Sequence, residues 1–302
     1  VISKLDVLSS LAEYAESANC VCPEIIEEGD IVIEEGRHPV VEAYCKDGGF
    51  VSNSFSSSKA RFALITGPNM AGKSTYLRQI ALIVLLAHIG AMVPARKATI
   101  PLADRIFCRV GASDNLSRGE STFLVEMSET AAILRSATRR SLVIMDEVGR
   151  GTSTQDGMSL AYAVMKYLAE LGSITLFATH YHELTMLDTY GMQLLHMAVS
   201  EEKDSIVFLR KAVEGAARSS YGIHVAKLAG LPYQVIREAS AFQKRHFEDY
   251  SSFDDTQGNL FTSAAQDTGN GDRIISMIED FDTDRSSPMD ALVFISKLKE
   301  ML

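Results

Sequence analysis

The chain alternates between continuous apolar runs and segments with helical periodicity. Runs at 62–66, 141–145 and 174–178 are almost wholly apolar and predict buried strands. Between them, apolar positions recur every three to four residues and predict helices, one directly after the first run and others over about 122–138 and 158–171. Continuous apolar strands are typical of a parallel sheet covered on both faces. The pattern therefore predicts an α/β fold with a mainly parallel sheet flanked by helices.

Weaker patterns predict the remaining elements. Residues 1–18 read as the end of a helix with one apolar face, and residues 193–213 read as a β-hairpin. Residues 222–244, broken at Gly230-Leu231-Pro232, outline a helix–turn–helix unit, with simple helix packing as the alternative. The face of the first helix holds Leu5, Leu8, Leu11 and Ala12. Further strands are predicted at 31–33, 40–44 and 104–110.

Composition narrows the class of protein. The 302 residues are 46% hydrophobic and 23% charged, as in globular proteins, and no stretch of eighteen uncharged apolar residues predicts a membrane span. Four cysteines lack zinc-site spacing, so we expect thiols in a reducing, cytoplasmic setting. The N-terminus has no initiator Met and no signal-peptide layout. We therefore expect a portion of a longer cytoplasmic protein.

Charge is concentrated at the C-terminal end. The formal net charge is −10, and residues 248–302 hold twelve acidic and four basic residues. The rest of the chain is thus close to neutral and lacks the basic footprint of a nucleic-acid-binding surface. The polar, acidic composition of 248–285 predicts a disordered linker, and an amphipathic pattern near the end predicts a last helix over 286–302.

A glycine-rich loop follows the first apolar run. It reads Gly67-Pro68-Asn69-Met70-Ala71-Gly72-Lys73-Ser74, and strand, glycine loop and helix together are the context of a phosphate-binding P-loop. Its N–H groups and the helix N-terminus would cradle phosphates. Lys73 would reach the β- and γ-phosphates and the Ser74 hydroxyl would ligate Mg²⁺. The alternative is an ordinary glycine turn.

Acidic and imidazole side chains follow the next two strands. Asp146 and Glu147 come at the end of 141–145 in a Walker B pattern, where Asp146 would hold Mg²⁺ and Glu147 would act as general base. Both can act only where the strand is ending, since neighbouring strand residues point to opposite faces. His180 follows 174–178 and could sense a γ-phosphate. The alternatives are that Asp146 and Glu147 form an ordinary acidic turn after a buried strand and that His180 is simply a packed histidine.

A second loop opens the helix predicted at about 122. Residues 117–123 include Gly119 and Ser121 at a helix N-terminus, which is a further phosphate-capable position. One P-loop needs no second cradle from its own subunit, so we expect this loop to face the nucleotide of a partner subunit. A simple N-cap by Ser121 or Thr122 is the alternative.

With these motifs in order, the chain resembles the C-terminal ATPase portion of the MutS family of bacterial DNA mismatch-recognition proteins, over residues 1–245. The matching segments are 36–41, 66–76, 146–154, 177–181 and 220–223. The resemblance implies a Mg²⁺-dependent ABC-type ATPase, a P-loop NTPase that binds ATP in two composite sites of a dimer.

The resemblance also implies roles for individual residues. Gly67 to Ser74 and Thr75 would bind phosphates, with Asn69 contacting the γ-phosphate and His180 as the switch histidine. Ser121 with Gly119 would complete the opposite subunit's site. Phe50 matches an adenine-stacking position, and Arg210 falls where the family has a histidine. Ala71 replaces the family's usual Gly and requires a negative φ.

The implied domain layout has five parts. They are the end of a core or lever helix (1–20), the ATPase domain (21–215), a helix–turn–helix dimerisation element (216–247), the linker (248–285) and a C-terminal self-association helix (286–302). Gln257, Leu260 and Phe261 resemble a sliding-clamp-binding peptide. Other implied partners are a second copy of the chain, a MutL-type repair protein, and mismatched DNA through domains that this chain does not contain.

Two other functions are compatible with parts of this pattern. A paralogue that suppresses recombination or rescues ribosomes should carry a basic nuclease tail, which the acidic C-terminal residues do not provide. A non-enzymatic assembly and clamp-tethering module would bind nucleotide only as a structural ligand. The presence of both Glu147 and His180 favours hydrolysis over that reading.

Overall fold

The computed structural model describes residues 1–45, 49–111, 122–187, 191–202, 205–217 and 221–247. The chain divides into two units, Val1–Ile236 and Arg237–Leu302, and the second is described only as far as residue 247. Within the described ranges, every helix is too short or too polar to cross a membrane.

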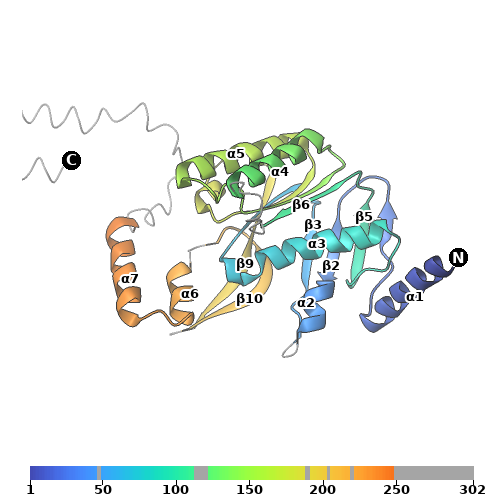
Figure 1. The fold of residues 1–302 in the computed structure, drawn as a ribbon, viewed down its shortest axis with the longest axis horizontal. Helices are drawn as coiled ribbons and strands as arrows, with labels where there is room; N and C mark the ends of the chain where they lie inside the picture. Colours follow the sequence, from blue (N-terminus) through green and yellow to red (C-terminus); the bar gives the residue numbers. More distant parts are fainter. Residues whose placement is uncertain (46–48, 112–121, 188–190, 203–204, 218–220, 248–302) are drawn as a thin grey trace, which may run out of the picture. The chain divides into compact units, whose positions relative to one another are not determined.

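A six-stranded sheet forms the centre of the first unit (Figure 1). Its order is β10-β9-β4-β8-β7-β6, and all neighbours are parallel except the hairpin β9–β10. The three predicted apolar runs form its buried middle strands, so the prediction of a mainly parallel sheet is confirmed. Their bounds are β4 (Phe62–Thr66), β7 (Leu142–Asp146) and β8 (Ile174–Ala178). The outer strands are β6 (Ile106–Val110), β9 (Met192–Glu202) and β10 (Ser205–Glu214).

Helices cover both faces of this sheet, because successive residues of each strand point to opposite sides. Ile144 of β7 packs in one apolar cluster with α3 (Lys73–His88). Its neighbours Val143 and Met145 pack in a second cluster with α4 (Thr122–Ser136) and α5 (Thr154–Leu171). Figure 1 shows α4 and α5 together on one side and α3 on the other. The three predicted flanking helices are confirmed, with α5 beginning earlier than expected at its Ser153 N-cap.

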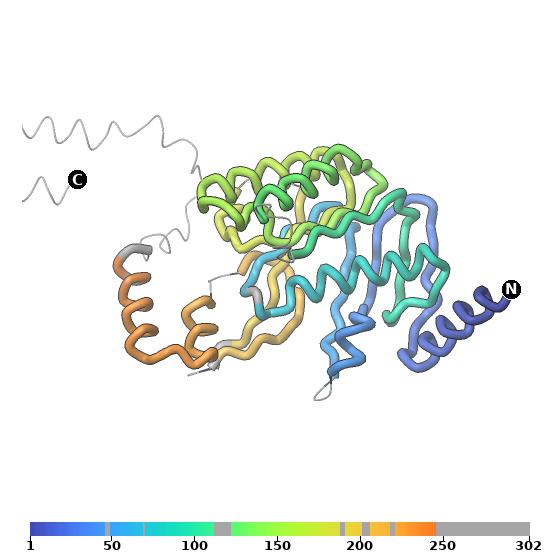
Figure 2. Tube along the Cα trace, viewed as in Figure 1, coloured from blue at the N-terminus to red at the C-terminus, as the bar shows by residue number. Residues whose placement is uncertain are grey.

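A second, four-stranded sheet also packs against α3, and Figure 2 shows this helix running across the strands. Its apolar residues Ile33, Phe55 and Ile100 belong to the same cluster as α3, which is therefore buried between two sheets. Only part of one of these strands was predicted. The order is β1-β5-β2-β3, with β1 (Glu24–Ile26), β5 (Lys97–Pro101), β2 (Val32–Gly36) and β3 (Asn53–Ser56).

The strand predicted at 40–44 is wrong, since these residues form helix α2 (Pro39–Tyr44). Val40 and Val41 favour a strand, but Pro39 stands at the first helical position, where its fixed φ suits a helix. His38 caps the helix, because its Nδ1 accepts a hydrogen bond from the Val41 N–H at 3.2 Å. Burial lowers the pKa of His38, which favours the neutral imidazole that can accept this bond.

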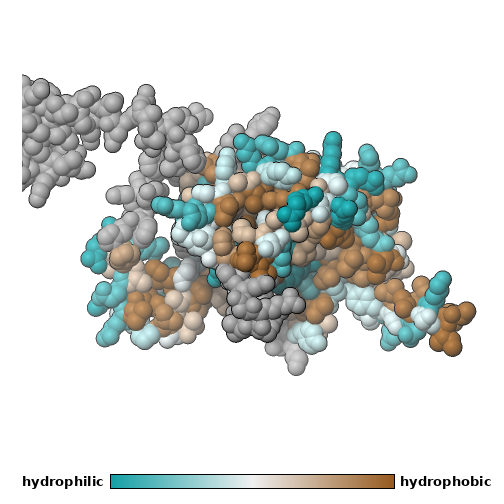
Figure 3. Space-filling model, turned by 45° about the horizontal axis from the view of Figure 1, so that its top comes forward, coloured by the Kyte–Doolittle hydropathy of each residue, from teal (hydrophilic) through white to brown (hydrophobic). Residues whose placement is uncertain are grey.

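The first helix and the last two described helices agree with the predicted pattern. Helix α1 spans Ile2–Ser17, α6 spans Gly222–Leu228 and α7 spans Tyr233–Phe247. The break at Gly230-Leu231-Pro232 lies between α6 and α7, and their assignment as a helix–turn–helix unit stays a prediction. Leu5 and Leu8 of α1 are exposed, and Figure 3 shows apolar residues at that end of the chain.

Several predicted features fall outside the described residues. They are the linker at 248–285, the terminal helix at 286–302 and the clamp-binding residues Gln257, Leu260 and Phe261. The predicted domain boundaries also stay predictions. All four cysteines are free thiols.

Candidate functional site

The glycine loop connects the end of β4 to the start of α3. Gly67 has φ 123° and Gly72 has φ 100°, values that a residue with a Cβ rarely adopts. Ala71 lies in the single 3₁₀ turn η1 (Asn69–Ala71) and is absent from the residues with positive φ, as its side chain requires. Pro68 precedes this turn, Met70 is exposed, and Thr75 is half-buried in the first turn of α3.

Lys73 points back into the loop. Its side chain is buried and its ammonium donates a hydrogen bond to the Gly67 carbonyl. Burial lowers the pKa of Lys73, while the nearby carboxylates of Glu147 and Asp146 act in the opposite direction. The lysine therefore places a positive charge inside the glycine loop and within electrostatic range of both acidic residues.

Ser74 and Asp146 meet where α3 begins and β7 ends. The Ser74 hydroxyl donates a hydrogen bond of 2.6 Å to Asp146 Oδ2, although the two residues are 72 positions apart in the sequence. Asp146 is buried, which raises the pKa of its carboxyl group. Its other oxygen, Oδ1, is buried and has no hydrogen-bond partner among the residues that the structure describes. A buried acceptor of this kind is costly unless something binds it.

Glu147 lies directly after the end of β7, with a left-handed φ of 54°. Its N–H donates to the Ala178 carbonyl at 3.0 Å, which anchors it beside the end of β8. The left-handed turn frees Glu147 from the strand's alternation, so both acidic side chains can reach the same cavity. Its Oε2 accepts a hydrogen bond from Arg150 Nη1 at 2.6 Å.

His180 follows β8 at the same edge of the sheet. Its ring is exposed and lies against Tyr181, with 4.0 Å between ring centroids. The surrounding protein displaces water and lowers the pKa of His180, although the nearby Glu147 opposes this shift. The neutral imidazole is therefore favoured, and it lies within electrostatic range of Glu147, Arg150 and Lys73.

A cavity of about 410 Å³ opens at this edge of the sheet. Sequence reasoning placed Ser74, Asp146 and Glu147 there, and it missed the charged side chains that complete the wall. Arg78 lies one turn after Ser74 on α3, a spacing that could have signalled it. Arg109 and Glu126 have no such local signal. The lining residues are Ser74, Arg78, Arg109, Val110, Gly111, Thr122, Glu126, Asp146, Glu147, Arg150 and Gly151.

Phe50 and Arg210, the two residues expected at the adenine, lie on segments that the side chain of Asn53 links by hydrogen bonds. Phe50 is half-buried and precedes β3, and Arg210 lies exposed in an irregular part of β10 with φ 53°. The buried Asn53 amide donates to the carbonyls of Val51 and Arg210 at 3.2 and 2.9 Å. Its oxygen accepts from the Ala212 N–H at 2.8 Å.

Arg210 is also close to the glycine loop, because a Cβ added at Gly72 would lie 4.0 Å from Arg210 Cβ. Asn53 could not be singled out from local sequence, because two of its partners are remote in the chain.

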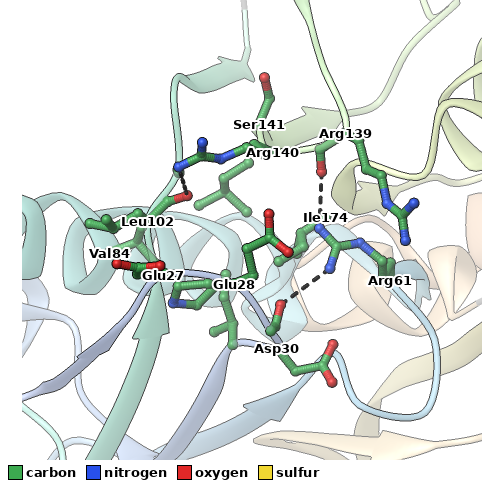
Figure 4. Close-up of a pocket in the computed structure, with 15 residues that line it drawn as sticks. Glu27, Glu28, Asp30, Arg61, Val84, Leu102, Arg139, Arg140, Ser141 and Ile174 are labelled. Atoms are coloured by element: carbon green, nitrogen blue, oxygen red, sulfur yellow. Dashed lines mark hydrogen bonds between the residues drawn. The ribbon is translucent and has the colours of Figure 1, made fainter.

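A second cavity, of about 470 Å³, lies at the opposite edge of the sheet (Figure 4). It is lined by residues at the amino ends of the parallel strands, such as Arg61, Leu142 and Ile174. Arg61 directs its guanidinium to the carbonyls of Gly29, Gly172 and Arg139, so its donors hold backbone in place. Ligands of open α/β sheets bind at the carboxyl ends of the strands, which favours the first cavity as the functional one.

Three predicted contacts cannot be placed. Gly119 and Ser121 lie outside the described residues, and the side chain of Asn69 does too, although its backbone belongs to η1. Across the described ranges, no three His, Cys, Asp or Glu side chains gather to hold a metal. A metal at Ser74 and Asp146 would therefore take its remaining ligands from phosphate and water, as Mg²⁺ commonly does.

Comparison with known proteins agrees with the motif pattern. The family model for MutS domain V matches residues 63–246. The DNA mismatch repair protein MutS of Caldanaerobacter subterraneus subsp. tengcongensis is 50% identical over 99% of this chain and 35% of its own length. The protein of the same name from Treponema pallidum is 56% identical over 81% of this chain and 28% of its own length. The chain thus spans about a third of the length of these relatives. It belongs to the MutS family.

Proposed function

We propose that this chain is the ATP-binding and ATP-hydrolysing module of a DNA mismatch-repair protein, built as an ABC-type ATPase. The relatives that cover nearly the whole chain carry the name DNA mismatch repair protein MutS, which supports the biological role. The chemistry is supported independently, by the residues that the fold assembles at the carboxyl edge of the large sheet.

The observation that carries the proposal is the 2.6 Å contact between Ser74 Oγ and Asp146 Oδ2. It joins the glycine loop to the acidic strand end at one point. Within the described part of the chain Asp146 Oδ1 has no hydrogen-bond partner, so the Ser74 hydroxyl and this carboxylate oxygen remain for a hard cation, and both groups fit Mg²⁺. When bound, Mg²⁺ would neutralise phosphate charge and orient the phosphate chain.

The other residues have distinct tasks in this proposal. Lys73 would exchange its bond to the Gly67 carbonyl for a phosphate oxygen and offset negative charge there. Glu147 would accept a proton from the attacking water through Oε1, because Arg150 occupies Oε2. His180, neutral and within electrostatic range of Glu147 and Lys73, would hydrogen-bond near the γ-phosphate. Phe50 and Arg210 would flank the adenine.

The proposal extends to partners. A second copy of the chain would complete each site through Ser121 and Gly119, so that ATP closes a dimer and hydrolysis reopens it. In the longer protein, this cycle would couple mismatched DNA to a MutL-type repair partner. Gln257, Leu260 and Phe261 would tether a sliding clamp.

The central test is Glu147→Gln in the full chain, with Glu183→Gln as a matched control. Glu183 is an exposed carboxylate near His180 that does not line the cavity. Loss of the general base should lower multiple-turnover ATP hydrolysis by about 10²–10⁴-fold. Stoichiometric binding of ATP with Mg²⁺ should persist, and the control should hydrolyse ATP normally.

Two measurements separate the alternatives. Normal turnover by Glu147→Gln would reject the role assigned to this carboxylate. Binding without multiple turnover by the unmodified chain would favour an assembly module instead of an ATPase. Light scattering of Glu147→Gln with and without ATP reports dimer closure, and an unchanged mass would contradict the composite-site proposal.

A further inference from the structure

A buried ion pair lies behind the proposed catalytic carboxylate. Arg109 of β6 and Glu126 of α4 face each other with 3.4 Å between Nη2 and Oε2, and their side chains are only 6% and 5% exposed. Burying two charges removes their hydration, which largely cancels the attraction between them. Stability alone is therefore a weak reason for this pair, and its other contacts indicate a more specific role.

Each partner also holds a backbone group next to Glu147. Arg109 Nη1 donates to the Asp146 carbonyl at 2.9 Å, which belongs to the peptide bond that leads into Glu147. Glu126 Oε1 accepts from the Gly149 N–H at 2.6 Å, two residues after Glu147. The ion pair thus fixes the backbone on both sides of the carboxylate.

The backbone between these two points is in an unfavourable conformation. Glu147 has φ 54°, and a residue with a side chain stays in the left-handed region only where its surroundings enforce it. Its own N–H is bonded to the Ala178 carbonyl. The Gly149 carbonyl accepts a hydrogen bond of 3.0 Å from the Tyr181 hydroxyl, next to His180. The N–H and the carbonyl of Gly149 are therefore both hydrogen-bonded to buried side chains.

We infer that the Arg109–Glu126 pair is the positioning device that holds Glu147 in its left-handed conformation and aims its carboxylate into the cavity. Neither residue touches the reacting atoms in this scheme. Arg109 acts through the Asp146 carbonyl, and Glu126 acts through the Gly149 amide. The inference rests on the proposed function, because it assigns these two positioning residues to the same ATPase site.

The test compares Arg109→Lys and Glu126→Gln with the control Glu129→Gln in the full chain. Lysine keeps the charge, but it lacks the rigid fork by which Arg109 reaches the Asp146 carbonyl through Nη1 and Glu126 through Nη2. Glu129 also faces Arg109, at 3.8 Å from Nε, but it is 55% exposed and holds no backbone of the 147–149 segment. The control therefore removes a carboxylate beside the same arginine without releasing Glu147.

We expect kcat for ATP hydrolysis to fall about 10–100-fold in Arg109→Lys and in Glu126→Gln, since a small misplacement of a reacting group has effects of this size. KM should stay within about threefold, because the residues that hold the nucleotide are unchanged. The double variant should lose little more than the worse single variant, because the pair acts as a unit. Glu129→Gln should match the unmodified chain.

Hydrogen exchange without nucleotide supplies a second readout that is independent of activity. The amides of residues 147–149 should exchange roughly tenfold faster in both variants, because a buried charged acceptor or its support is lost. Amides of β8 should exchange at the rate of the unmodified chain, which shows that the sheet remains folded. A variant whose whole chain exchanges faster has lost stability generally, and that result would overturn the positioning role.

Glu147→Gln, assayed in parallel, separates the two claims. If it hydrolyses ATP normally, the proposed function fails whatever the ion-pair variants do. If it is inactive while Arg109→Lys and Glu126→Gln keep normal kcat and normal exchange at 147–149, the positioning inference is wrong and the proposed function stands.

Discussion

The contact between Gly157 of α5 and Gly149 of the loop after β7 leads to the sharpest stability prediction. A Cβ added at Gly157 would lie 2.2 Å from the Gly149 carbonyl oxygen and 2.2 Å from the Tyr181 hydroxyl oxygen. Ordinary van der Waals contact begins at 3.4 Å, so both atoms would have to move by more than an ångström. These two atoms are hydrogen-bonded to each other at 3.0 Å. Gly157→Ala should therefore destabilise the chain, although alanine is the better helix former.

The expected size follows from opposing effects. Alanine in place of glycine inside a helix stabilises by about 1 kcal/mol. Overpacking a well-packed contact costs about 1–3 kcal/mol. Breaking the buried bond between Tyr181 and Gly149 costs about 1–3 kcal/mol more, because it leaves polar groups without partners. The net loss in the free energy of unfolding should be about 1–5 kcal/mol.

Urea unfolding followed by circular dichroism measures this loss, and the absence of tryptophan makes the helix signal preferable to fluorescence. Gly222→Ala is the matched control, since Gly222 begins α6 and an added Cβ would meet no atom within 4 Å. The control should change stability by less than about 0.5 kcal/mol. Equal or greater stability of Gly157→Ala would show that the loop and α5 can separate freely, contrary to this reasoning.

Three further predictions concern single groups. Ser74→Ala should weaken Mg²⁺-dependent ATP binding by about tenfold or more and leave Mg²⁺-free binding nearly unchanged. Calorimetry with and without Mg²⁺ measures both affinities. An equal loss of affinity under the two conditions would show that the hydroxyl serves only Asp146. Burial raises the pKa of Asp146 above its ordinary value, so the folded state holds this proton more tightly than the unfolded chain. Its contribution to stability is thus present below the ordinary carboxyl pKa and is lost as pH rises through the raised one. The unfolding free energy of the unmodified chain relative to Asp146→Asn should therefore fall as the pH rises from about 4 towards neutrality. A rise over that interval would contradict this. His38→Ala should lower stability by about 1 kcal/mol, because the Val41 N–H loses its cap, and an unchanged urea midpoint would show that the cap is dispensable.

The parts of the fold that follow from local sequence were predictable. The strands β4, β7 and β8 are continuous apolar runs, and the glycine loop has the spacing of a phosphate-binding P-loop. Helix α2 was mistaken for a strand because the preference of Val40 and Val41 outweighed Pro39 in the prediction. The four-stranded sheet was largely missed because its strands are three to five residues long and one of them is far from the others in sequence.

The residues of the candidate site likewise fall into those that a motif predicts and those that only the tertiary structure shows. Ser74, Asp146 and Glu147 could be named from their motifs, and the fold brings them to one edge of the sheet. Arg109 and Glu126 could not, because an arginine on a strand and a glutamate on a helix have no pattern that marks them as a pair. Their significance comes from contacts with Asp146 and Gly149, which are 37 and 23 positions away. Such contacts are a property of the tertiary structure.

The Asn53 amide links the small sheet to the large sheet by hydrogen bonds at one place. It extends from β3 of the small sheet to the irregular part of β10 in the large sheet. Because two hydrogen bonds of one rigid group span this junction, a tilt of the small sheet would drag Arg210 relative to Gly72. The separation of Arg210 from the glycine loop would then follow the tilt of the small sheet against the large one. A displacement of the small sheet would thereby reach the proposed nucleotide site without passing through α3.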